Sequence, residues 1–370
     1  MKTKVTHLTS AHPRYDTRIF VKMCCSLAKK ECYDVSLVVA DAQGDEVKNG
    51  VHIFDVGKKS GRVRRILGTT KEVFLKAKSL ESDIYHLHDP ELLPVGLKLK
   101  KLGKIVIFDA HEDLPKQILG KSYLYPWMRR VLSRLTAMYE RYACGKFDAI
   151  VTATPYIRDK FSEITNVRTV DINNFPIITE FEEDISWKEK ENAVCYIGAI
   201  AKIRGISEII KSLEYVDNVK LLLGGKFSEF QTATEVKTYA GWHHVEELGF
   251  LGRKEVSKVL RRSKAGLVTL HPIVNYQDAL PVKMFEYMAA GVPVISSDIA
   301  LWRRIVEESA CGLCVDPLDP KAIAEAINHI VSHPQEAEQM GKNGQKAVLT
   351  KYNWAIEEQK LYRLYEGLFS

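Results

Sequence analysis

The 370-residue sequence has no apolar run long enough to cross a membrane. A membrane-spanning helix needs about 20 predominantly apolar residues, whereas the longest apolar runs, such as 35–40 and 104–108, have the length of a strand. The N-terminus enters a strand pattern at once and lacks the apolar stretch and small-residue cleavage site of a signal peptide. We therefore expect a cytoplasmic protein.

Cysteine and histidine clusters with metal-ligand spacing are also scarce. The seven cysteines lie mostly in apolar runs, as free buried thiols do in a reducing compartment. Cys311 and Cys314 have the spacing of a redox or zinc motif, but no second pair completes a tetrahedral site. We favour a buried strand edge there over a metal or redox site.

Positive charge is unevenly distributed along the chain. Residues 1–180 contain 30 Lys and Arg against 21 Asp and Glu, a balance of +9, whereas residues 181–370 contain 23 against 26, a balance of −3. The basic half favours an anionic partner. Because it carries no recognised nucleic-acid-binding motif, we expect no nucleic acid there and consider an anionic membrane surface instead.

Apolar strand patterns alternate with helical patterns in both halves of the chain. We expect strands at 5–9, 35–40, 51–56, 84–88, 105–109, 149–153 and 167–171, and again at 194–198, 219–223, 245–248, 265–270, 292–296 and 313–315. This alternation predicts parallel, doubly wound sheets, and the length predicts two domains. We expect two Rossmann-like α/β domains facing across a cleft, with ligands at the carboxyl ends of the strands.

The expected domain boundaries follow from composition. The first domain comprises residues 1–175, and an acidic, strand-poor linker occupies 176–192. The second domain comprises 193–352, and a terminal helix occupies 353–370.

The most informative segment is 275–295. It places Asp278 in a turn and Glu286, eight positions later, on a helix that Gly291 and Pro293 end. The turn also offers backbone N–H groups at a helix start, where a phosphate can bind. Two acids flanking an anion-binding turn favour a nucleotide sugar as ligand.

This segment resembles the nucleotide-sugar signature of the family-4 retaining glycosyltransferases of GT-B fold. That signature has two glutamates separated by seven residues and a Glu-Tyr-Met-Ala-x-Gly-x-Pro-Val-Ile tail, which is present at 286–295. Asp278 stands where the family usually has the first Glu, and by resemblance it contacts the transferred sugar. Glu286 then accepts hydrogen bonds from the ribose hydroxyls. Capping and surface charge are the alternative roles for both acids.

The resemblance also implies which residues bind the diphosphate and the base. The N–H groups of Ala279 and Leu280 are expected to face it, while Lys283 is either a phosphate partner or a helix-surface cation. The turn at 196–206 resembles the family's diphosphate-binding strand–turn–helix. Its expected donor-binding residues are Gly198, Lys202 and Arg204. The turn at 248–253 resembles the base-binding turn of the family, with Gly249 and Phe250 as expected contacts.

In the first half, the segment 108–113 resembles the family's Asp-x-His-Glu element, so His111 is the expected catalytic histidine. His88 and Asp89 also follow a strand and are candidates for orienting an acceptor hydroxyl, although Asp89 would equally serve as a helix cap. Arg14 and Arg18 are candidates for contacting an acceptor phosphate. The segment 121–135 mixes aromatic residues with cations, which suits either a lipid interface or a helix with a solvated basic face.

No Asp-x-Asp triplet occurs, so we expect a metal-independent reaction in which side chains and N–H dipoles neutralise the leaving diphosphate. The resemblance implies retention at the anomeric carbon, no cofactor beyond a UDP- or GDP-linked sugar, and a terminal helix that crosses back to the first domain. The charge of the first domain favours a lipid-linked glycan acceptor of O-antigen or capsule synthesis, held peripherally at the inner membrane. The alternatives are a non-catalytic sugar-nucleotide-binding scaffold and a sugar-nucleotide epimerase of the same architecture.

Overall fold

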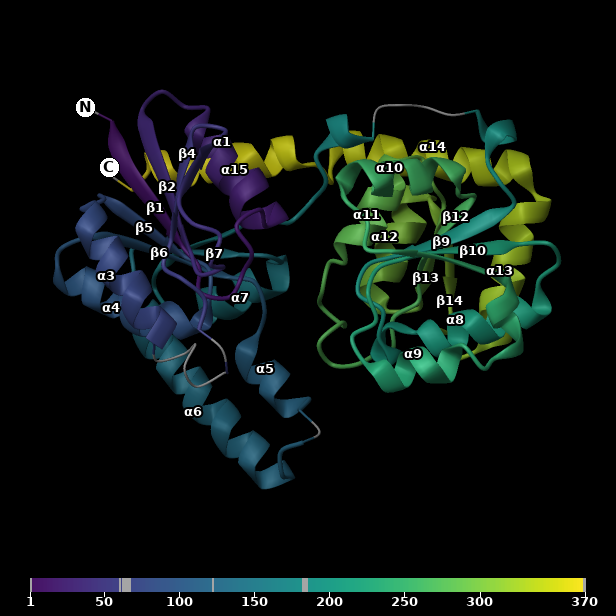
Figure 1. Cartoon of the computed structure of the whole chain (residues 1–370), viewed down its shortest axis with the longest axis horizontal. Helices are drawn as coiled ribbons and strands as arrows, with labels where there is room; N and C mark the ends of the chain where they lie inside the picture. The colour runs from purple at the N-terminus through teal and green to yellow at the C-terminus, as the bar shows by residue number, and fades with distance from the viewer. Residues whose placement is uncertain (1, 60, 62–67, 122, 182–185, 369–370) are drawn as a thin grey trace. The chain divides into compact units, whose positions relative to one another are not determined.

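The computed structural model describes all residues except 1, 60, 62–67, 122, 182–185 and 369–370. The chain forms two compact units, one made of residues 1–174 and 357–370 and the other of residues 175–356 (Figure 1). Each unit has its own parallel sheet and hydrophobic core, so the predicted Rossmann-like two-domain architecture is confirmed. Residues 182–185 of the expected linker lie outside the described residues.

The first unit contains an eight-stranded sheet in the order β3-β4-β2-β1-β5-β6-β7-β8. Its strands are β1 (Thr3–Leu8), β2 (Tyr33–Val39), β3 (Glu46–Lys48), β4 (Val51–Asp55), β5 (Ile84–Leu87), β6 (Ile105–Ala110), β7 (Ala149–Thr152) and β8 (Arg168–Asp171). All neighbouring strands are parallel except β3 and β4. Because β1, β5 and β6 are adjacent and parallel, the residues that follow them gather at one edge of the sheet.

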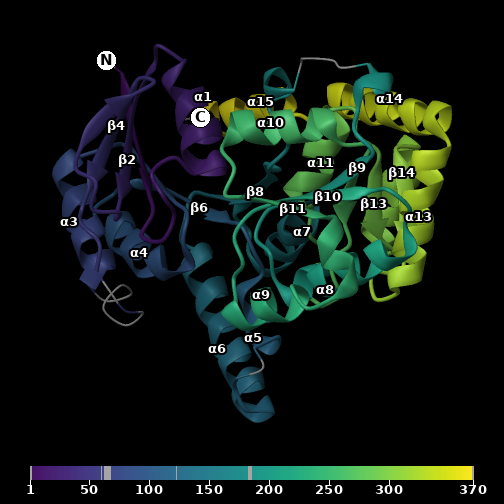
Figure 2. The same cartoon turned by 45° about the vertical axis from the view of Figure 1, so that its right-hand side comes forward.

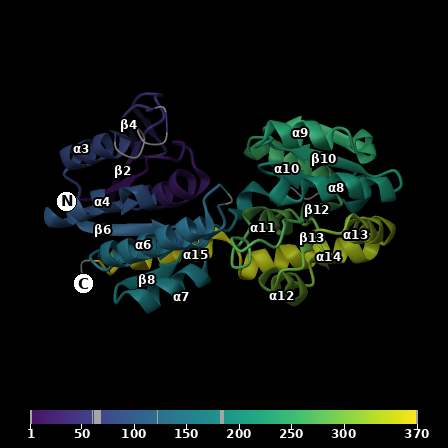
Figure 3. The ribbon, with the colours of Figure 1, turned by 90° about the horizontal axis from the view of Figure 1, so that it is seen from below.

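Helices cover both faces of this sheet. They are η1 (Thr17–Cys24, a π-helix), α1 (Cys25–Ala28), α3 (Thr70–Leu80), α4 (Leu93–Lys101), α5 (Leu114–Leu119), α6 (Pro126–Cys144), α7 (Pro155–Ile164) and α15 (Trp354–Glu366). On one face, α3, α4, α6 and α7 share a core with alternate strand residues such as Leu87 and Phe108, and α3 and α4 lie side by side (Figure 3). On the other, Tyr362 of α15 donates to the Ser26 carbonyl at 2.9 Å. The predicted return of the terminal helix to the first domain is confirmed.

The second unit contains a six-stranded parallel sheet in the order β11-β10-β9-β12-β13-β14. Its strands are β9 (Ala193–Ile197), β10 (Lys220–Gly224), β11 (Val245–Gly249), β12 (Ala265–Val268), β13 (Val294–Ser297) and β14 (Gly312–Val315). Its α-helices are α8 (Ile206–Ser212), α9 (Phe230–Val236), α10 (Arg253–Arg262), α11 (Val282–Ala289), α12 (Ala300–Ser309), α13 (Pro320–Ser332) and α14 (Pro334–Thr350). One core lies beneath α10, α11 and α12, and the other beneath α8 and α13. Figures 1 and 2 show α10 and α11 on one side of the strands and α8 and α9 on the other.

Local chemistry explains where several of these helices begin. Thr154 and Asp113 cap α7 and α5 by accepting backbone N–H groups, and both helices carry proline in the first turn. Gly205, before α8, has a positive φ of 78°, and a Cβ there would lie 2.0 Å from the Thr269 carbonyl oxygen, so the turn requires glycine. None of the described helices is both long and apolar enough to cross a membrane.

Candidate active site

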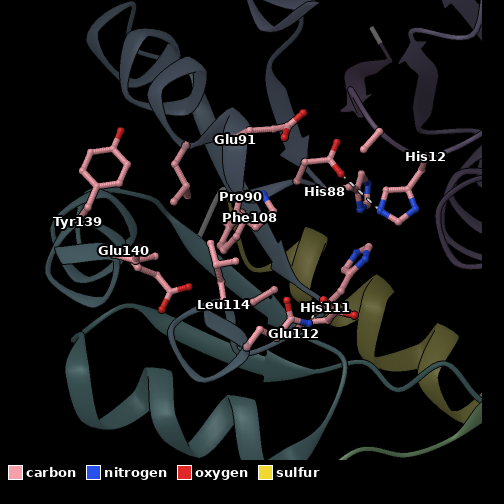
Figure 4. Close-up of a pocket in the computed structure, with 16 residues that line it drawn as sticks. His12, His88, Pro90, Glu91, Phe108, His111, Glu112, Leu114, Tyr139 and Glu140 are labelled. Carbon is pink, nitrogen blue, oxygen red and sulfur yellow. Dashed lines mark hydrogen bonds and ion pairs between the residues drawn. The ribbon is translucent and has the colours of Figure 1, made fainter. Parts of the chain in front are cut away.

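A cavity of about 480 Å³ opens in the first unit at the carboxyl ends of β1, β5 and β6. Each strand contributes polar residues to it: His12 follows β1, His88 and Asp89 follow β5, and His111 follows β6. His12, His88 and His111 gather at one side of the cavity (Figure 4). The structure therefore brings three of the predicted first-domain residues together in one pocket.

Asp109 is the centre of a hydrogen-bond network beneath this pocket. Its carboxylate accepts from His111 Nε2 at 2.7 Å, His88 Nδ1 at 3.1 Å and both Nε and Nη2 of Arg18, at 3.0 and 2.7 Å. Because a carboxylate offers only acceptors, His111 carries its proton on Nε2. His111 is thus anchored through Nε2, and its ring lines the pocket.

A chain of histidines continues from Asp109 into the core. His88 Nε2 lies 2.8 Å from His7 Nδ1, and the hydroxyl of Tyr365 lies 3.4 Å from His7 Nε2 and 2.8 Å from His86 Nδ1. His7 and His86 are neighbours in the β1–β5 register, which explains their contact. Since Asp109 fixes the His88 proton on Nδ1, His88 Nε2 accepts and His7 Nδ1 donates.

The buried histidines are neutral. Burial lowers the pKa of His7 and His86 well below its usual value, and the neighbouring His88 ring lowers both further. Burial also lowers the pKa of His88, although Asp109 opposes it. Burial alone would raise the pKa of Asp109, but Arg18 and His111 outweigh it and hold that pKa well below the usual range.

Two groups of described residues place potential metal-ligand atoms within 4.8 Å of one another: His7, His86 and His88, and His88, Asp109 and His111. Both Asp109 oxygens are already bound by the Arg18 guanidinium, whose charge repels a cation. We therefore interpret both groups as parts of the hydrogen-bond network.

Arg14 and Arg18, the residues expected to contact an acceptor phosphate, have internal partners in the structure. Arg14 is buried and binds Asp41 with Nε and Nη2 and Glu46 with Nη1, at 2.7–2.8 Å. Arg18 is buried too, and besides Asp109 it donates to the Ile172 carbonyl at 2.6 Å. Internal partners occupy both guanidinium groups, so we assign them a structural role.

His12 also lines the pocket and was not predicted from the sequence. Its ring lies 3.5 Å from Asp16 and 3.4 Å from Asp89. Burial lowers the pKa of His12, but the hydrogen bond to Asp16 and the charge of Asp89 outweigh it, so the net pKa is raised. Asp89 itself accepts from the Thr9 hydroxyl and the Ser10 N–H, at 2.9 and 2.6 Å.

In the second unit, three of the predicted donor-binding residues lie together after β9. A Cβ on Gly198, whose φ is 133°, would lie 3.5 Å from Lys283 Nζ and 3.9 Å from Arg204 Nη1. Lys283 Nζ also lies 3.5 Å from the centre of the Tyr196 ring. The hydroxyl of Tyr196 donates to the Ala199 carbonyl at 2.9 Å and interacts with Arg204. Two basic side chains thus meet at a glycine turn.

Lys283 is buried, and its Nζ has no hydrogen-bond partner among the described residues. Burial lowers its pKa well below the usual value, and the charge of Arg204 lowers it further. A buried ammonium without an acceptor is costly, whereas a phosphate would supply both acceptors and compensating charge. Of the two roles considered for Lys283, its burial excludes a helix-surface cation.

Glu286 is also buried, on α11, and Arg253 Nη1 donates to its Oε1 at 2.6 Å. Arg253 begins α10 and also binds Glu180. The turn before it contains Gly249, with a φ of 67°, and Phe250, which is 75% exposed. The ion pair therefore joins the turn after β11 to the acid-bearing helix.

The remaining predicted donor-binding residues are Lys202, Asp278, Ala279 and Leu280. Lys202 is exposed and lies 4.0 Å from Glu235 on α9. The N–H of Ala279 donates to the Tyr276 carbonyl at 3.3 Å, and the Ala279 carbonyl accepts from Trp302 at 2.7 Å. The N–H of Ala279, expected to face a diphosphate, is therefore engaged in a local turn. Asp278 and Leu280 flank this turn and are half-buried.

Asp109 and Arg253 were not among the residues predicted from the sequence. Asp109 precedes His111 by two residues at the end of a strand, and the alternation of side chains along a strand would place both on one face. Arg253 lies three residues after Phe250 in the turn already selected. The local sequence around His7 and Tyr365 does not indicate that they join this network, because their contacts depend on strand register and on the packing of α15.

Two family models match the chain. The model described as Glycosyltransferase Family 4 matches residues 18–174, and that described as Glycosyl transferases group 1 matches residues 177–347. Phosphatidyl-myo-inositol mannosyltransferase of Mycobacterium leprae is 24% identical over 299 residues, which cover 77% of this chain and 73% of that protein.

Solved structures match over nearly the whole chain. Sucrose-phosphate synthase from Thermosynechococcus elongatus has a TM-score of 0.80 at 18% identity and covers 100% of this chain and 99% of its own. Anabaena Alr3699/HepE in complex with UDP and glucose has a TM-score of 0.75 at 13% identity, covering 99% and 100%. At these identities the likeness shows a common fold.

Proposed function

Because the chain belongs to the family-4 glycosyltransferases of GT-B fold, we propose that it transfers a sugar from a nucleoside diphosphate to an acceptor hydroxyl with retention of configuration. The observation that carries the proposal is Lys283, a buried amino group without a hydrogen-bond partner among the described residues, beside Gly198 and Arg204. This arrangement suits a diphosphate because two cations can neutralise it without a metal ion.

The second unit provides the donor site in this proposal. Arg204 and Lys283 bind the diphosphate, and Glu286 accepts hydrogen bonds from the ribose diol. Gly249 and Phe250 contact the base, and Asp278 contacts the transferred sugar. UDP is the first candidate nucleotide, since HepE, a protein of the same fold, is described in complex with UDP and glucose. Lys202 and the N–H of Leu280 are secondary candidates for phosphate contact.

The pocket of the first unit provides the acceptor side. His111, held by Asp109, contacts the reacting sugar, while His88 and Asp89 shape the acceptor site. Attack from the face that the diphosphate leaves needs no protein nucleophile, and the departing phosphate accepts the acceptor proton. The protein contributes positioning and charge stabilisation.

We further propose a lipid-linked glycan as acceptor, in cell-surface polysaccharide synthesis of the O-antigen or capsule type, at the inner membrane surface. Two observations support it. The first 180 residues carry a balance of +9, which favours an anionic surface. The mannosyltransferase relative of Mycobacterium leprae is named for a lipid, phosphatidyl-myo-inositol.

A two-part experiment tests the proposal. UDP and GDP are first tested for thermal stabilisation, since a ligand that binds the folded state raises the melting temperature. Labelled nucleotide sugars are then incubated with lipid-linked and with free sugar acceptors. We expect transfer to the lipid-linked acceptor. Stabilisation without turnover would instead support a non-catalytic binding protein, and conversion of the donor without acceptor an epimerase. Equal activity on free sugars would contradict the lipid-linked acceptor.

A further inference from the structure

Helix α6 carries its apolar side chains outward. It spans 19 residues, and together with the turn before it presents ten large hydrophobic residues to solvent. They are Tyr123, Tyr125, Trp127, Met128, Val131, Leu132, Leu135, Met138, Tyr139 and Tyr142. The buried side of the helix is instead formed by Ser133, Glu140, Ala143 and Cys144. This is the reverse of an ordinary surface helix, whose apolar stripe faces the core.

Helical geometry places these exposed apolar residues on one face. At about 100° per residue, the positions from Trp127 to Tyr142 fall within one contiguous arc. Arg130, Arg134 and Arg141 are exposed and lie side by side along one border of that arc. The outer surface of α6 is thus divided lengthwise into an apolar strip and a row of cations.

The acids of α6 do not balance these arginines. Glu140 is the single acidic residue between 126 and 144, and it is buried and paired with Lys160 at 2.7 Å. Every exposed charge on the helix is therefore positive. An exposed apolar patch bordered by arginines and containing Trp and Tyr has the composition of a helix that lies in a bilayer interface.

We propose that the outward face of α6 docks the protein onto an anionic lipid bilayer, with the apolar strip among the acyl chains and the arginines at the phosphates. A second copy of the chain is a less suitable occupant. A symmetric contact repeats the same patch on both partners, so it would offer the arginines no acidic residue of α6 to pair with. Figure 1 shows α6 extending from the body of its unit together with α5, and the apolar residues of its outer face are exposed.

The same helix reaches the pocket of the first unit. Thr136 and Tyr139 of α6 line the cavity that also contains His111, and Figure 4 shows Tyr139 at the side opposite the histidines. A bilayer against α6 would therefore lie beside the pocket. This part of the inference rests on the proposed function, because it implies that a lipid-linked acceptor reaches the pocket along α6 without leaving the membrane.

Vesicle flotation tests the docking surface without any enzymatic activity. The full chain is mixed with vesicles of phosphatidylcholine, with or without about one-third phosphatidylglycerol. We expect binding to the anionic vesicles that Leu135→Gln/Met138→Gln reduces about tenfold and that each of Arg130→Gln and Arg134→Gln reduces about fivefold. Leu349→Gln, at a leucine of α14 that is 59% exposed against 57% for Leu135, is the matched apolar control, and Lys346→Gln is the charge control.

Light scattering and transfer assays separate the remaining outcomes. The proposal would be overturned if the wild-type protein did not bind anionic vesicles. It would also be overturned if the α6 variants bound them as well as the control variants do. So would a stable dimer that Leu135→Gln dissociates. Failure of the proposed function has a different signature, since vesicle binding would persist without sugar transfer. Retained transfer to a soluble acceptor by Leu135→Gln/Met138→Gln, with reduced transfer to the vesicle-embedded acceptor, supports delivery along α6.

Discussion

His111 Nε2 donates a 2.7 Å hydrogen bond to Oδ2 of Asp109, the same oxygen that accepts from Arg18 Nε and His88 Nδ1. One buried carboxylate therefore sets the tautomer of the pocket histidine and anchors it to the sheet. Asp109 acts through His111, which makes Asp109 a positioning residue in the proposed reaction.

Replacing Asp109 by asparagine tests this relationship. We expect Asp109→Asn to lower kcat about 100-fold with little change in the donor KM, because an amide does not fix the Nε2 proton of His111. The variant also leaves Arg18 as an uncompensated buried charge, which costs about 3–5 kcal/mol of the free energy of unfolding. Asp113→Asn, in the same loop, keeps a capping side chain and is the control. A folded Asp109→Asn enzyme with wild-type kcat would contradict the positioning role.

The buried histidines predict that stability falls as the pH falls. Their pKa values are lowered in the folded state, so the unfolded chain binds more protons below about pH 6.5, and each contributes up to about 1.4 kcal/mol per pH unit there. Asp109, whose pKa is also lowered, adds to the loss below about pH 4. Urea unfolding at several pH values measures the slope. His86→Leu should reduce the dependence of the free energy of unfolding on pH, while His333→Gln, at an exposed histidine, should not. A free energy of unfolding that rises toward pH 5 would contradict neutral buried histidines.

Lys283 predicts a trade-off between stability and donor binding. Lys283→Met removes a buried amino group without a described hydrogen-bond partner, so the free protein should gain about 1–3 kcal/mol in stability. The same variant should lose the thermal stabilisation by UDP or GDP, because the diphosphate loses a cation. Melting temperatures with and without nucleotide measure both effects. Lys254→Met, at an exposed lysine of α10, should change neither. Undiminished nucleotide stabilisation in Lys283→Met would exclude Lys283 from the donor site.

Glu286 predicts discrimination between ribose and deoxyribose. The wild type should bind UDP about tenfold more tightly than its 2′-deoxy analogue, because the carboxylate accepts from the diol. In Glu286→Gln this preference should shrink, since the amide is a weaker acceptor. Calorimetric titration of both nucleotides into the wild type and the variant measures how far the preference for ribose depends on Glu286. Glu325→Gln, at an exposed glutamate, is the control. An unchanged preference in Glu286→Gln would place the ribose elsewhere.

The sequence predicted the strand–helix alternation well, because buried parallel strands are nearly continuous apolar runs that local composition identifies. Thirteen of the strands in the described residues overlap the expected ranges, from β1 to β14 with the exception of β3. That antiparallel edge strand, Glu46–Lys48, has only three residues, mostly exposed, with a single apolar side chain, so it carried no apolar run.

The site was predicted less completely, because side-chain partners depend on tertiary contacts. Their position after the first strand predicted that Arg14 and Arg18 lie near a pocket. Their ion-pair partners could not be predicted, because Asp41 is 27 positions from Arg14 and Asp109 is 91 positions from Arg18. Likewise, the burial of Lys283 follows from the packing of α11 on its sheet and is not visible in the spacing of charges. Motifs thus located the carboxyl edges of both sheets, while the structure decided which groups are free to meet a ligand.

The most direct test of the central claim is transfer of labelled sugar from a nucleoside diphosphate sugar to a lipid-linked acceptor, measured with and without EDTA. The account predicts a product with the anomeric configuration of the donor, an unchanged rate in EDTA and a rate lowered about tenfold or more in Glu286→Gln. A rate abolished by EDTA, or a Glu286→Gln enzyme as fast as the wild type, would contradict it.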